Sequence, residues 1–358
     1  MNAPARRLID VSEIARMLDA RADTLVRELL PDGKRRGHEW VARCPWAMHE
    51  NLGSFSVHIG GAKSGVWKKF NSGEHGDALD LVARVLFGGD KKAAIQWATR
   101  WLGLASGDPN AIARVRRETP SAEAVAVAEK EEARARRGLA HRLWIGAEAK
   151  LAGTPVDRYL KGRGIDLAEL GRAPRAIRYH PALFHVPSNR KWPAMVTMVT
   201  GPDGAFAACH RTWLEVQTDG SVKKAPLGKE GKMVLGSYAG ACIRLWRGRT
   251  GKSLKDAEPG EIVDVTEGIE DGLSVAMALG DTRVLAAISL SNMGEVSLPP
   301  NVAAVRLWKQ NDEHPQAIAA FETAAKAHMA AGREVYIPLI PTTLKDVNDL
   351  IRAEVVDV

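Results

Sequence analysis

Apolar side chains recur at two different spacings along the first hundred residues of the chain. Near the N-terminus they follow helical spacing, with Asp10 and Ser12 available as caps and Pro31 in the turn that ends the run. Further on, short runs alternate between apolar and polar positions, as strands do. The pattern predicts a helix over residues 10–30, strands within 38–70, and helices near 77–87 and 90–102. These elements predict a small α+β module over residues 1–104.

The stretch 105–140 has a different composition. It begins with Ser, Pro, Asp and Gly and continues with alternating acidic and basic residues among alanines, for example over 129–137. Few large apolar side chains occur before Leu139. We therefore expect a charged linker or exposed helix here.

The remaining chain shows two further patterns. Residues 141–255 contain a short helical segment and then strand-like runs, which predicts a second α+β module. Residues 256–358 alternate between β-branched runs and helical runs, which is typical of a parallel sheet covered by helices. The elements expected in 141–255 are a helix at 157–165 and strands at 194–199, 205–214 and 232–235.

Charge divides the chain unevenly. The net formal charge is +7, yet residues 256–358 hold 17 Asp and Glu against seven Lys and Arg, a net of −10. Residues 1–255 therefore carry +17. A basic region binds phosphates, and an acidic region repels them unless cations intervene. This asymmetry favours a protein that acts on nucleic acid with the help of metal ions.

Three further features limit the class of protein. The three cysteines, Cys44, Cys209 and Cys242, are odd in number and far apart, so no disulfide framework is expected. No run resembles a signal peptide or a membrane span, which predicts a cytoplasmic protein without a membrane partner. No phosphate-binding loop of the Walker type occurs, so we expect the chain not to be its own helicase.

Carboxylates lie at three places in the acidic region where an apolar run meets a loop or helix. Glu267 and Asp271 come after the run 262–266, Asp312 follows 303–307, and Asp346 precedes the final helical segment. Ligands bind at the carboxyl ends of strands in open parallel sheets. Carboxylates there prefer Mg²⁺, which commonly acts on phosphates. The pattern predicts Glu267, Asp271, Asp312 and Asp346 as catalytic residues, with Glu267, Asp312 and Asp346 binding Mg²⁺ or Mn²⁺.

The same acidic motifs resemble the toprim domain of bacterial-type primases, and most closely the primases of phages and plasmids. The matching elements are Glu267-Gly268 with Asp271, then Asn311-Asp312, then residues 345–349. The resemblance implies a Rossmann-like parallel sheet. One departure is clear: Gln310 stands where the family has the first Asp of an Asp-x-Asp pair. A Gln offers a carbonyl oxygen but no negative charge, which leaves open a toprim fold that binds nucleic acid without catalysis.

The N-terminal module is similar to the zinc-binding domain of those primases over residues 35–102. Cys44 and His49 stand where two zinc ligands are expected, whereas Lys69 and Ser72 replace the second pair. Because tetrahedral zinc needs four ligands, we expect a zinc-ribbon-derived module that has lost its zinc. The aromatic residues Trp40, Trp67 and Phe70 are expected to fill the former metal corner.

The middle module resembles the basic half of the primase polymerase domain. Residues 206–255 hold ten Lys and Arg against three Asp and Glu. The resemblance implies that these residues bind template and nucleotide phosphates, and a Trp here offers a face for stacking on single-stranded bases. The residues expected to bind are His210, Arg211, Trp213, Lys223, Lys224, Lys229 and Lys232.

The resemblance therefore implies a DNA primase-like protein of phage or mobile-element type, expected to synthesise short RNA primers from nucleoside triphosphates (NTPs) on single-stranded DNA with Mg²⁺. A replicative helicase is the expected partner. Two alternatives remain open: a non-catalytic single-stranded DNA-binding or replisome adaptor protein, and a toprim nuclease. The expected boundaries are a zinc-binding-like domain at 1–104, a linker at 105–140, a basic template-binding subdomain at 141–255 and a toprim domain at 256–358.

Overall fold

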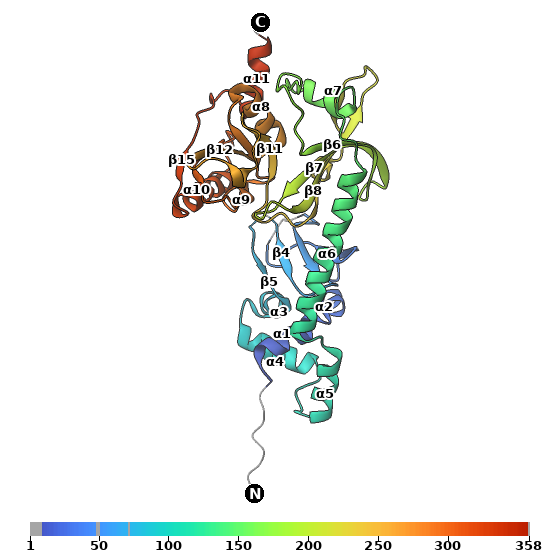
Figure 1. Ribbon diagram of the computed structural model, residues 1–358. Coiled ribbons are helices and arrows are strands. Elements are labelled where there is room, and N and C mark those ends of the chain that lie inside the picture. The colour runs from blue at the N-terminus through green and yellow to red at the C-terminus, as the bar shows by residue number, and fades with distance from the viewer. Residues whose placement is uncertain (1–8, 48–50, 71, 357–358) are drawn as a thin grey trace. The chain divides into compact units, whose positions relative to one another are not determined.

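The structure is a computed structural model that describes residues 9–47, 51–70 and 72–356. Contacts divide the chain into two compact units, Met1–Glu132 and Ala133–Val358 (Figure 1). Within the described ranges, no helix combines the length and the apolar character that a membrane span needs. The predicted boundaries at 104, 140 and 255 stay predictions. Strand β11 (Ile243–Arg247) lies before the predicted boundary at 255, yet it pairs with β13 in the sheet of the C-terminal domain.

The first unit combines a small antiparallel sheet with a group of helices. Its strands pair in sequence order: β1 (Lys34–Arg36), β2 (Glu39–Ala42), β3 (Phe55–His58), β4 (Trp67–Lys69) and β5 (His75–Gly76). Its helices are α1 (Val11–Asp19), α2 (Ala22–Leu29), α3 (Ala78–Phe87), α4 (Lys91–Trp101), α5 (Pro109–Glu118) and the first part of α6 (Ala122–Gly146). The single helix predicted over 10–30 is wrong in one respect. Arg21, with φ −116° and ψ 20°, lies outside the helical region and separates α1 from α2.

Aromatic rings form a cluster at the corner beside β4, the strand with Lys69, which the sequence predicts to replace a zinc ligand. The ring centroids of Trp46, Phe55 and Trp67 lie 5.2, 5.3 and 5.5 Å apart. The guanidinium of Arg84 lies 5.3 Å from the Trp46 ring and 5.6 Å from the Trp67 ring. The prediction for Phe70 is wrong, because this side chain is 55% exposed. The cluster supplies apolar burial and cation–π contacts at this corner.

Of the two expected zinc ligands, the structure describes Cys44 and does not describe His49. Cys44 is buried in the core beside this cluster, and His49 lies outside the described residues. Among the residues that the structure describes, no three Asp, Glu, His or Cys side chains are grouped so as to hold a metal ion. The aromatic cluster is the feature that we expect to stabilise this module, because its rings pack closely on one another.

This assignment predicts that stability of the first unit depends on Trp67 and not on zinc. Trp67→Ala removes a fully buried side chain and should lower the free energy of unfolding by about 3–5 kcal/mol. A chelator should leave the melting temperature of the wild-type protein unchanged. Calorimetry with and without chelator measures both, and zinc bound near one equivalent in the purified protein would contradict the assignment.

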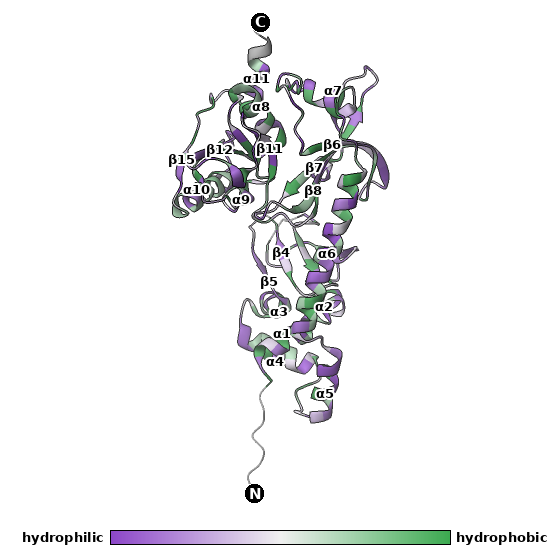
Figure 2. Ribbon diagram, in the orientation of Figure 1, coloured by the Kyte–Doolittle hydropathy of each residue, from purple (hydrophilic) through white to green (hydrophobic). Residues whose placement is uncertain are grey.

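The second unit begins with an antiparallel sheet, the basic sheet. Its order is β10-β8-β7-β6, and β9 also pairs with β8. The last turns of α6, with Ala140 and Trp144, pack on the face that carries Trp213, while α7 packs on the opposite face. Along α6, hydrophilic and hydrophobic segments alternate (Figure 2). The bounds are β6 (Ile177–His185), β7 (Arg190–Thr200), β8 (Phe206–Val216), β9 (Val222–Lys224), β10 (Lys232–Gly236), α7 (Pro155–Lys161) and the 3₁₀ turn Gly228–Gly231.

The C-terminal sheet has the expected parallel architecture. Its order is β11-β13-β12-β14-β15, with every pairing parallel except that of β11. Apolar side chains of α8 pack on one face of this sheet and those of α10 on the other. The α/β and α+β fold class is confirmed. The bounds are β12 (Glu261–Thr266), β13 (Arg283–Ala286), β14 (Val302–Leu307), β15 (Glu334–Tyr336), α8 (Ile269–Leu279), α9 (Leu290–Met293), α10 (Pro315–Ala330), α11 (Val347–Val356) and the 3₁₀ turn Leu254–Asp256.

A glycine allows α8 to lie against the sheet. A Cβ atom on Gly272 would lie 2.4 Å from the Leu245 Cδ1 atom and 2.9 Å from the Thr266 Oγ1 atom. Both distances are shorter than side-chain contacts allow. Gly272 therefore fixes how closely the helix that follows Glu267 approaches β11 and β12.

A buried carboxylate holds the two central strands together. Asp264 on β12 has no exposed surface and accepts hydrogen bonds from Arg306 at 2.8 and 2.7 Å, from the Trp308 indole at 2.7 Å, and from Thr282. Each of these donors lies 18 to 44 positions away in the sequence. The Asp264–Arg306 ion pair joins β12 to β14. The candidate functional site lies at the carboxyl ends of these two strands, so the ion pair helps to position it.

We predict that Asp264→Ala lowers the free energy of unfolding by about 3–5 kcal/mol, because it leaves the Arg306 charge without its partner. A matched control is Asp281→Ala, whose side chain is 73% exposed and 3.8 Å from Arg249. This exposed change should alter stability by less than about 0.5 kcal/mol. Urea denaturation measures both, and equal effects of the two substitutions would contradict the role given to Asp264.

Candidate nucleotide-binding site

Glu267 lies between the end of β12 and the start of α8. Its backbone carbonyl accepts a hydrogen bond from Ile288 N–H at 3.0 Å, and its carboxylate accepts one from the Leu290 backbone N–H. Ile288 has φ 77°, an unfavourable conformation for a β-branched residue. Such strain persists only where the surroundings impose it. The turn after β13 thus fixes both the backbone and the side chain of Glu267.

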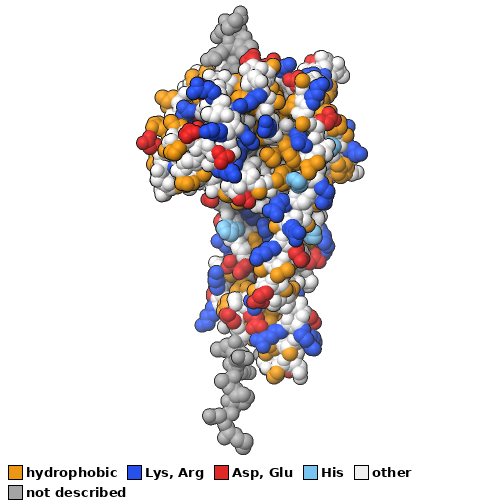
Figure 3. Space-filling model, viewed as in Figure 1, with side chains coloured by type: hydrophobic (Ala, Val, Ile, Leu, Met, Phe, Trp, Pro, Cys, Tyr) orange, Lys and Arg blue, Asp and Glu red, His pale blue; other side chains and the backbone are white. Residues whose placement is uncertain are grey.

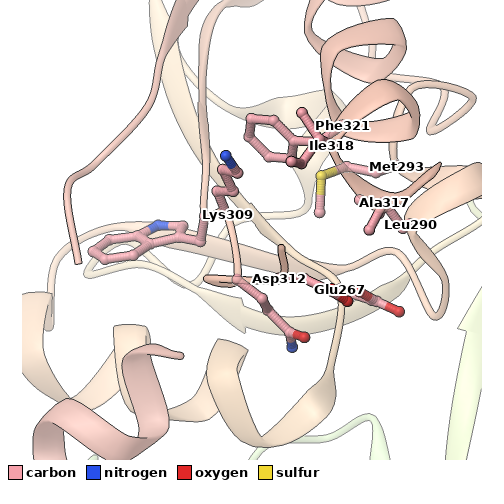
Figure 4. A pocket seen from close by; sticks show the side chains of 10 residues that line it. Glu267, Leu290, Met293, Lys309, Asp312, Ala317, Ile318 and Phe321 are labelled. Atoms are coloured by element: carbon pink, nitrogen blue, oxygen red, sulfur yellow. The ribbon is translucent and has the colours of Figure 1, made fainter. Parts of the chain in front are cut away.

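Asp312 faces Glu267 from the loop after β14. Burial raises the pKa of Glu267, and the charge of Asp312 raises it further, against the opposing effects of Leu290 and Lys232. Both carboxylates line a small solvent-open pocket whose other wall is apolar, with Met293 and Phe321 (Figure 4). Asp312 Oδ1 accepts a hydrogen bond from His314 N–H at 2.9 Å, which leaves the second carboxylate oxygen available. The two residues form a pair of carboxylates beside an open pocket.

Asp346 belongs to a second pair, with Asp271. The charge of Asp346 contributes to the raised pKa of Asp271, while Asp346 Oδ1 accepts a hydrogen bond from Asp349 N–H at 2.9 Å and so caps α11. Gln310 donates its amide to Asp271 Oδ2 at 2.9 Å. Among the described residues, no three His, Cys, Asp or Glu side chains are grouped closely enough to hold one metal ion. The predicted set Glu267, Asp312 and Asp346 is therefore not assembled as one three-carboxylate site, because Asp346 is placed by its helix beside Asp271.

Two asparagines place the segment that carries Lys345 and Asp346. The Asn311 side chain donates to the carbonyls of Leu344 and Pro341 at 2.7 and 3.0 Å, and its backbone N–H donates to the Lys345 carbonyl at 2.8 Å. Asn348 is fully buried and donates to the Arg163 carbonyl at 2.8 Å and to Ser274 Oγ at 2.9 Å. Asn311 and Asn348 thus hold this segment in place through hydrogen bonds.

The predicted phosphate-binding lysines of the basic sheet meet a buried carboxylate. Lys224 Nζ lies 2.9 Å from Glu270 Oε1, and Lys232 Nζ lies 3.6 Å from Glu270 Oε2. Tyr159 donates its hydroxyl to Glu270 Oε1 at 2.6 Å. Burial alone raises the pKa of Glu270, but Lys232 and Lys224 outweigh burial and hold the pKa below its usual range. Both lysines are held in place rather than free.

Two other predicted contacts are contradicted by burial. Trp213 is 1% exposed and packs between the guanidinium of Arg211 and the ring of His185, so its face is closed to a base. His210 is 6% exposed, and burial, with Lys232, lowers its pKa to about 4. A neutral, enclosed imidazole is unsuited to bind phosphate. The sequence pattern failed here because β8 lies between β7 and β10 and both of its faces are covered.

The remaining basic residues lie in different surroundings. Arg211 points to the face of β8 that packs on α6, together with Trp213, and burial lowers its pKa. Lys223 and Lys229 are exposed. Their contact with DNA stays a prediction. On the face shown in Figure 3, Lys and Arg side chains occur in both units with Asp and Glu among them.

The sequence analysis missed four residues near the acids: Glu270, Tyr159, Arg163 and Lys345. Arg163 follows α7 and lowers the pKa of Asp271, while Lys345 lowers that of Glu267. A third acid within the run 267–271 was the available signal for Glu270. Its partner Tyr159 lies 111 positions earlier, which no local pattern reveals.

Asp271 gives the site a testable pH dependence. Burial, with Asp346, raises its pKa to about 6. A group whose pKa is higher in the folded than in the unfolded state stabilises the fold when protonated, and this contribution is lost as pH rises through 6. In metal-free buffer, Asp271→Asn should therefore raise the free energy of unfolding above pH 6 relative to wild type and lose that advantage near pH 4.

The matched control for this experiment is Asp349→Asn, which changes a neighbouring acid paired at the surface with Arg352. Its stability should follow the wild-type pH profile. Chemical denaturation at several pH values measures both variants. If the free energy of unfolding of Asp271→Asn ran parallel to that of wild type between pH 4 and 7, the pKa of Asp271 would not be raised in the folded protein.

Comparisons with known protein families agree with the C-terminal fold. A toprim domain model matches residues 263–357. A second model, described as a domain of unknown function (DUF7146), matches residues 134–245. No curated protein matches the sequence. The predicted toprim domain is thus confirmed, and residues 263–357 form a domain of that family.

Similar solved structures include three primases. The zinc-binding and RNA polymerase domains of the Aquifex aeolicus primase share 16% identity, with 96% of this chain and 81% of that chain covered and a TM-score of 0.39. The primase fragment of the bacteriophage T7 primase-helicase protein shares 14% identity, with 88% and 95% covered and a TM-score of 0.36. A DNA primase domain from Pseudomonas aeruginosa shares 15% identity, with 61% and 75% covered and a TM-score of 0.41.

Proposed function

We propose that this protein is a primase that joins NTPs into short RNA primers on single-stranded DNA. The observation that carries the proposal is the pair Glu267 and Asp312, which line one pocket at the carboxyl ends of adjacent parallel strands. Lys232 and Lys345 lie close enough to lower the pKa of Glu267. Carboxylates and cations at one pocket suit a substrate that brings both a metal ion and phosphates.

The carboxylates fit Mg²⁺ or Mn²⁺. Mg²⁺ is commonly held by one or two protein carboxylates together with substrate phosphates and water, not by a full protein cage. Glu267 and Asp312 supply such a pair, and within the described part of the chain neither is in an ion pair. Burial, with a smaller effect of the Asp312 charge, raises the pKa of Glu267, and a bound cation would stabilise the ionised carboxylate against both. When bound, the ion would neutralise phosphate charge at the reacting centre.

The side chains would divide the reaction between them. The 3′-hydroxyl oxygen of the primer attacks the α-phosphorus of the incoming NTP, and the bond to the β-phosphate oxygen breaks to release pyrophosphate. Glu267 accepts the hydroxyl proton, and the burial that raises its pKa makes it a stronger base. Lys224, Lys232 and Lys345 would stabilise the triphosphate. Lys223 and Lys229, both exposed, would bind template phosphates without sequence preference.

A replicative helicase is the partner that we propose for this protein. The bacteriophage T7 protein is a primase-helicase. We expect this chain to act beside a replicative helicase rather than alone.

One observation favours the non-catalytic alternative, a single-stranded DNA-binding adaptor. Gln310 replaces an acid and donates its amide to Asp271 at 2.9 Å, so the second pair of carboxylates already has a neutral partner. If both pairs must bind cations for activity, this hydrogen bond would favour a protein that only binds nucleic acid.

Glu267→Gln tests the proposal. It removes the charge that would hold the cation and accept the proton, and primer synthesis should fall by at least about 100-fold, as expected when a general base is lost. Single-stranded DNA binding should change less than twofold. Labelled NTPs, a single-stranded template and Mg²⁺ or Mn²⁺ measure synthesis, and a gel shift measures binding.

Glu322→Gln, an exposed change on α10, is the matched control and should synthesise primers at the wild-type rate. New RNA from the wild-type protein supports the primase. A shifted but unchanged template supports the adaptor, and a shortened template supports a toprim nuclease. Full synthesis by Glu267→Gln would reject the role given to Glu267.

A further inference from the structure

Glu270 is a charged residue that the proposed reaction does not use. It lies on the first turn of α8, is 5% exposed, and makes three contacts with groups from α7, β9 and β10. These are the Tyr159 hydroxyl at 2.6 Å, Lys224 Nζ at 2.9 Å and Lys232 Nζ at 3.6 Å. A buried carboxylate is costly unless fully paired, so this arrangement needs a reason.

The register of the basic sheet brings the two lysines to one face. Lys224 pairs with Leu214, and Lys232 pairs with Thr212, two positions apart on β8. Residues two apart on a strand project to the same side. Two ammonium groups side by side repel each other, and the carboxylate of Glu270 between them offsets that repulsion. Glu270 therefore sets the spacing of the pair.

The cluster retains donors and positive charge for a ligand. Two ammonium groups against one carboxylate leave a formal net charge of +1. The side chains of Lys224 and Lys232 are 40% and 41% exposed, whereas that of Glu270 is 6% exposed. Each ammonium has three donors; Lys224 directs one of them to Glu270 at 2.9 Å, whereas Lys232, at 3.6 Å, lies beyond hydrogen-bond distance. The remaining donors suit a ligand with several anionic oxygens.

We propose that Glu270 is a positioning residue that fixes Lys224 and Lys232 as a preorganised pair for the triphosphate of the incoming nucleotide. This inference rests on the proposed function. In this role Glu270 acts through its contacts with the two lysines and not on the substrate itself. Preorganisation raises affinity because the side chains lose less freedom when the ligand binds.

The sign of one substitution separates positioning from simple charge effects. Glu270→Gln keeps the shape of the side chain and removes a negative charge. Electrostatics alone predicts tighter binding of an anion to the two lysines. Positioning predicts weaker binding, because Lys224 and Lys232 repel each other and separate. We expect the Kd for inorganic tripolyphosphate, and for ATP with Mg²⁺, to rise about tenfold, equivalent to roughly 1.4 kcal/mol.

The experiment is calorimetric titration of the full chain with each probe, without DNA or primer synthesis. Glu230→Gln is the matched control, since it removes an exposed carboxylate two positions before Lys232 and should leave the Kd within twofold. Lys224→Met should weaken binding in the wild-type background, with little further effect in the Glu270→Gln background, because the two residues act as one unit. Glu270→Asp, which keeps the charge, should restore part of the affinity.

The outcomes separate this inference from the proposed function. Wild-type or tighter binding by folded Glu270→Gln overturns the inference. Unchanged binding by Lys224→Met and Lys232→Met would instead reject the triphosphate site itself. If Glu270→Gln fails to fold, as judged by circular dichroism, Tyr159→Phe replaces it. Tyr159→Phe removes one hydrogen bond to Glu270 and should raise the Kd two- to threefold, and no rise at all counts against positioning.

Discussion

A buried carboxylate is costly without cationic partners, and those of Glu270, on helix α8, lie on the basic sheet. Its partners Lys224 and Lys232 belong to the basic sheet, and Tyr159 to the helix packed on it. The toprim helix α8 can therefore lie only where those groups converge. Since Glu267 directly precedes this helix and Asp271 follows Glu270, the same contacts set where the candidate site lies relative to the basic sheet.

The acids of the toprim domain divide into two kinds by their partners. Asp264, in the middle of β12, is satisfied by Arg306 and Trp308 and holds the strands in place. Glu267, three residues later at the strand end, has an acid as its neighbour across a pocket. Paired charge provides the framework, and unpaired charge at the strand ends provides the candidate chemistry. This division accounts for the different surroundings of Asp264, within β12, and Glu267, just after its end.

Tryptophan is used in an unexpected way throughout the chain. Arginine guanidinium groups lie 4.3 to 5.6 Å from indole rings in both units. Such contacts let a basic protein bury long cationic side chains against flat apolar surfaces. The indoles thus stabilise the protein's own arginines, and that is why Trp213 is closed to nucleic acid. The tryptophans in these contacts are Trp40, Trp46, Trp67, Trp144, Trp192, Trp213 and Trp246.

Local sequence pattern predicted the parts of the site that depend on local structure. The position of Glu267 after a strand follows from its own segment, and so does the parallel sheet. The pairing of Asp271 with Asp346, and that of Glu270 with Tyr159, depends on packing between segments 75 or more positions apart. The basic residues show the same limit. The resemblance to the primase polymerase domain pointed to Lys224 and Lys232, but their contact with a buried acid, and the burial of His210, follow from strand register.

The central claim is that Glu267 and Asp312 hold a divalent cation together with a nucleotide. Electron paramagnetic resonance of Mn²⁺ measures this directly, because bound and free Mn²⁺ give different signals. The account predicts that ATP increases Mn²⁺ binding to the protein, beyond what ATP alone binds, and that Asp312→Asn abolishes the increase. An equal increase in wild type and Asp312→Asn would contradict it, because the ion would then be held elsewhere.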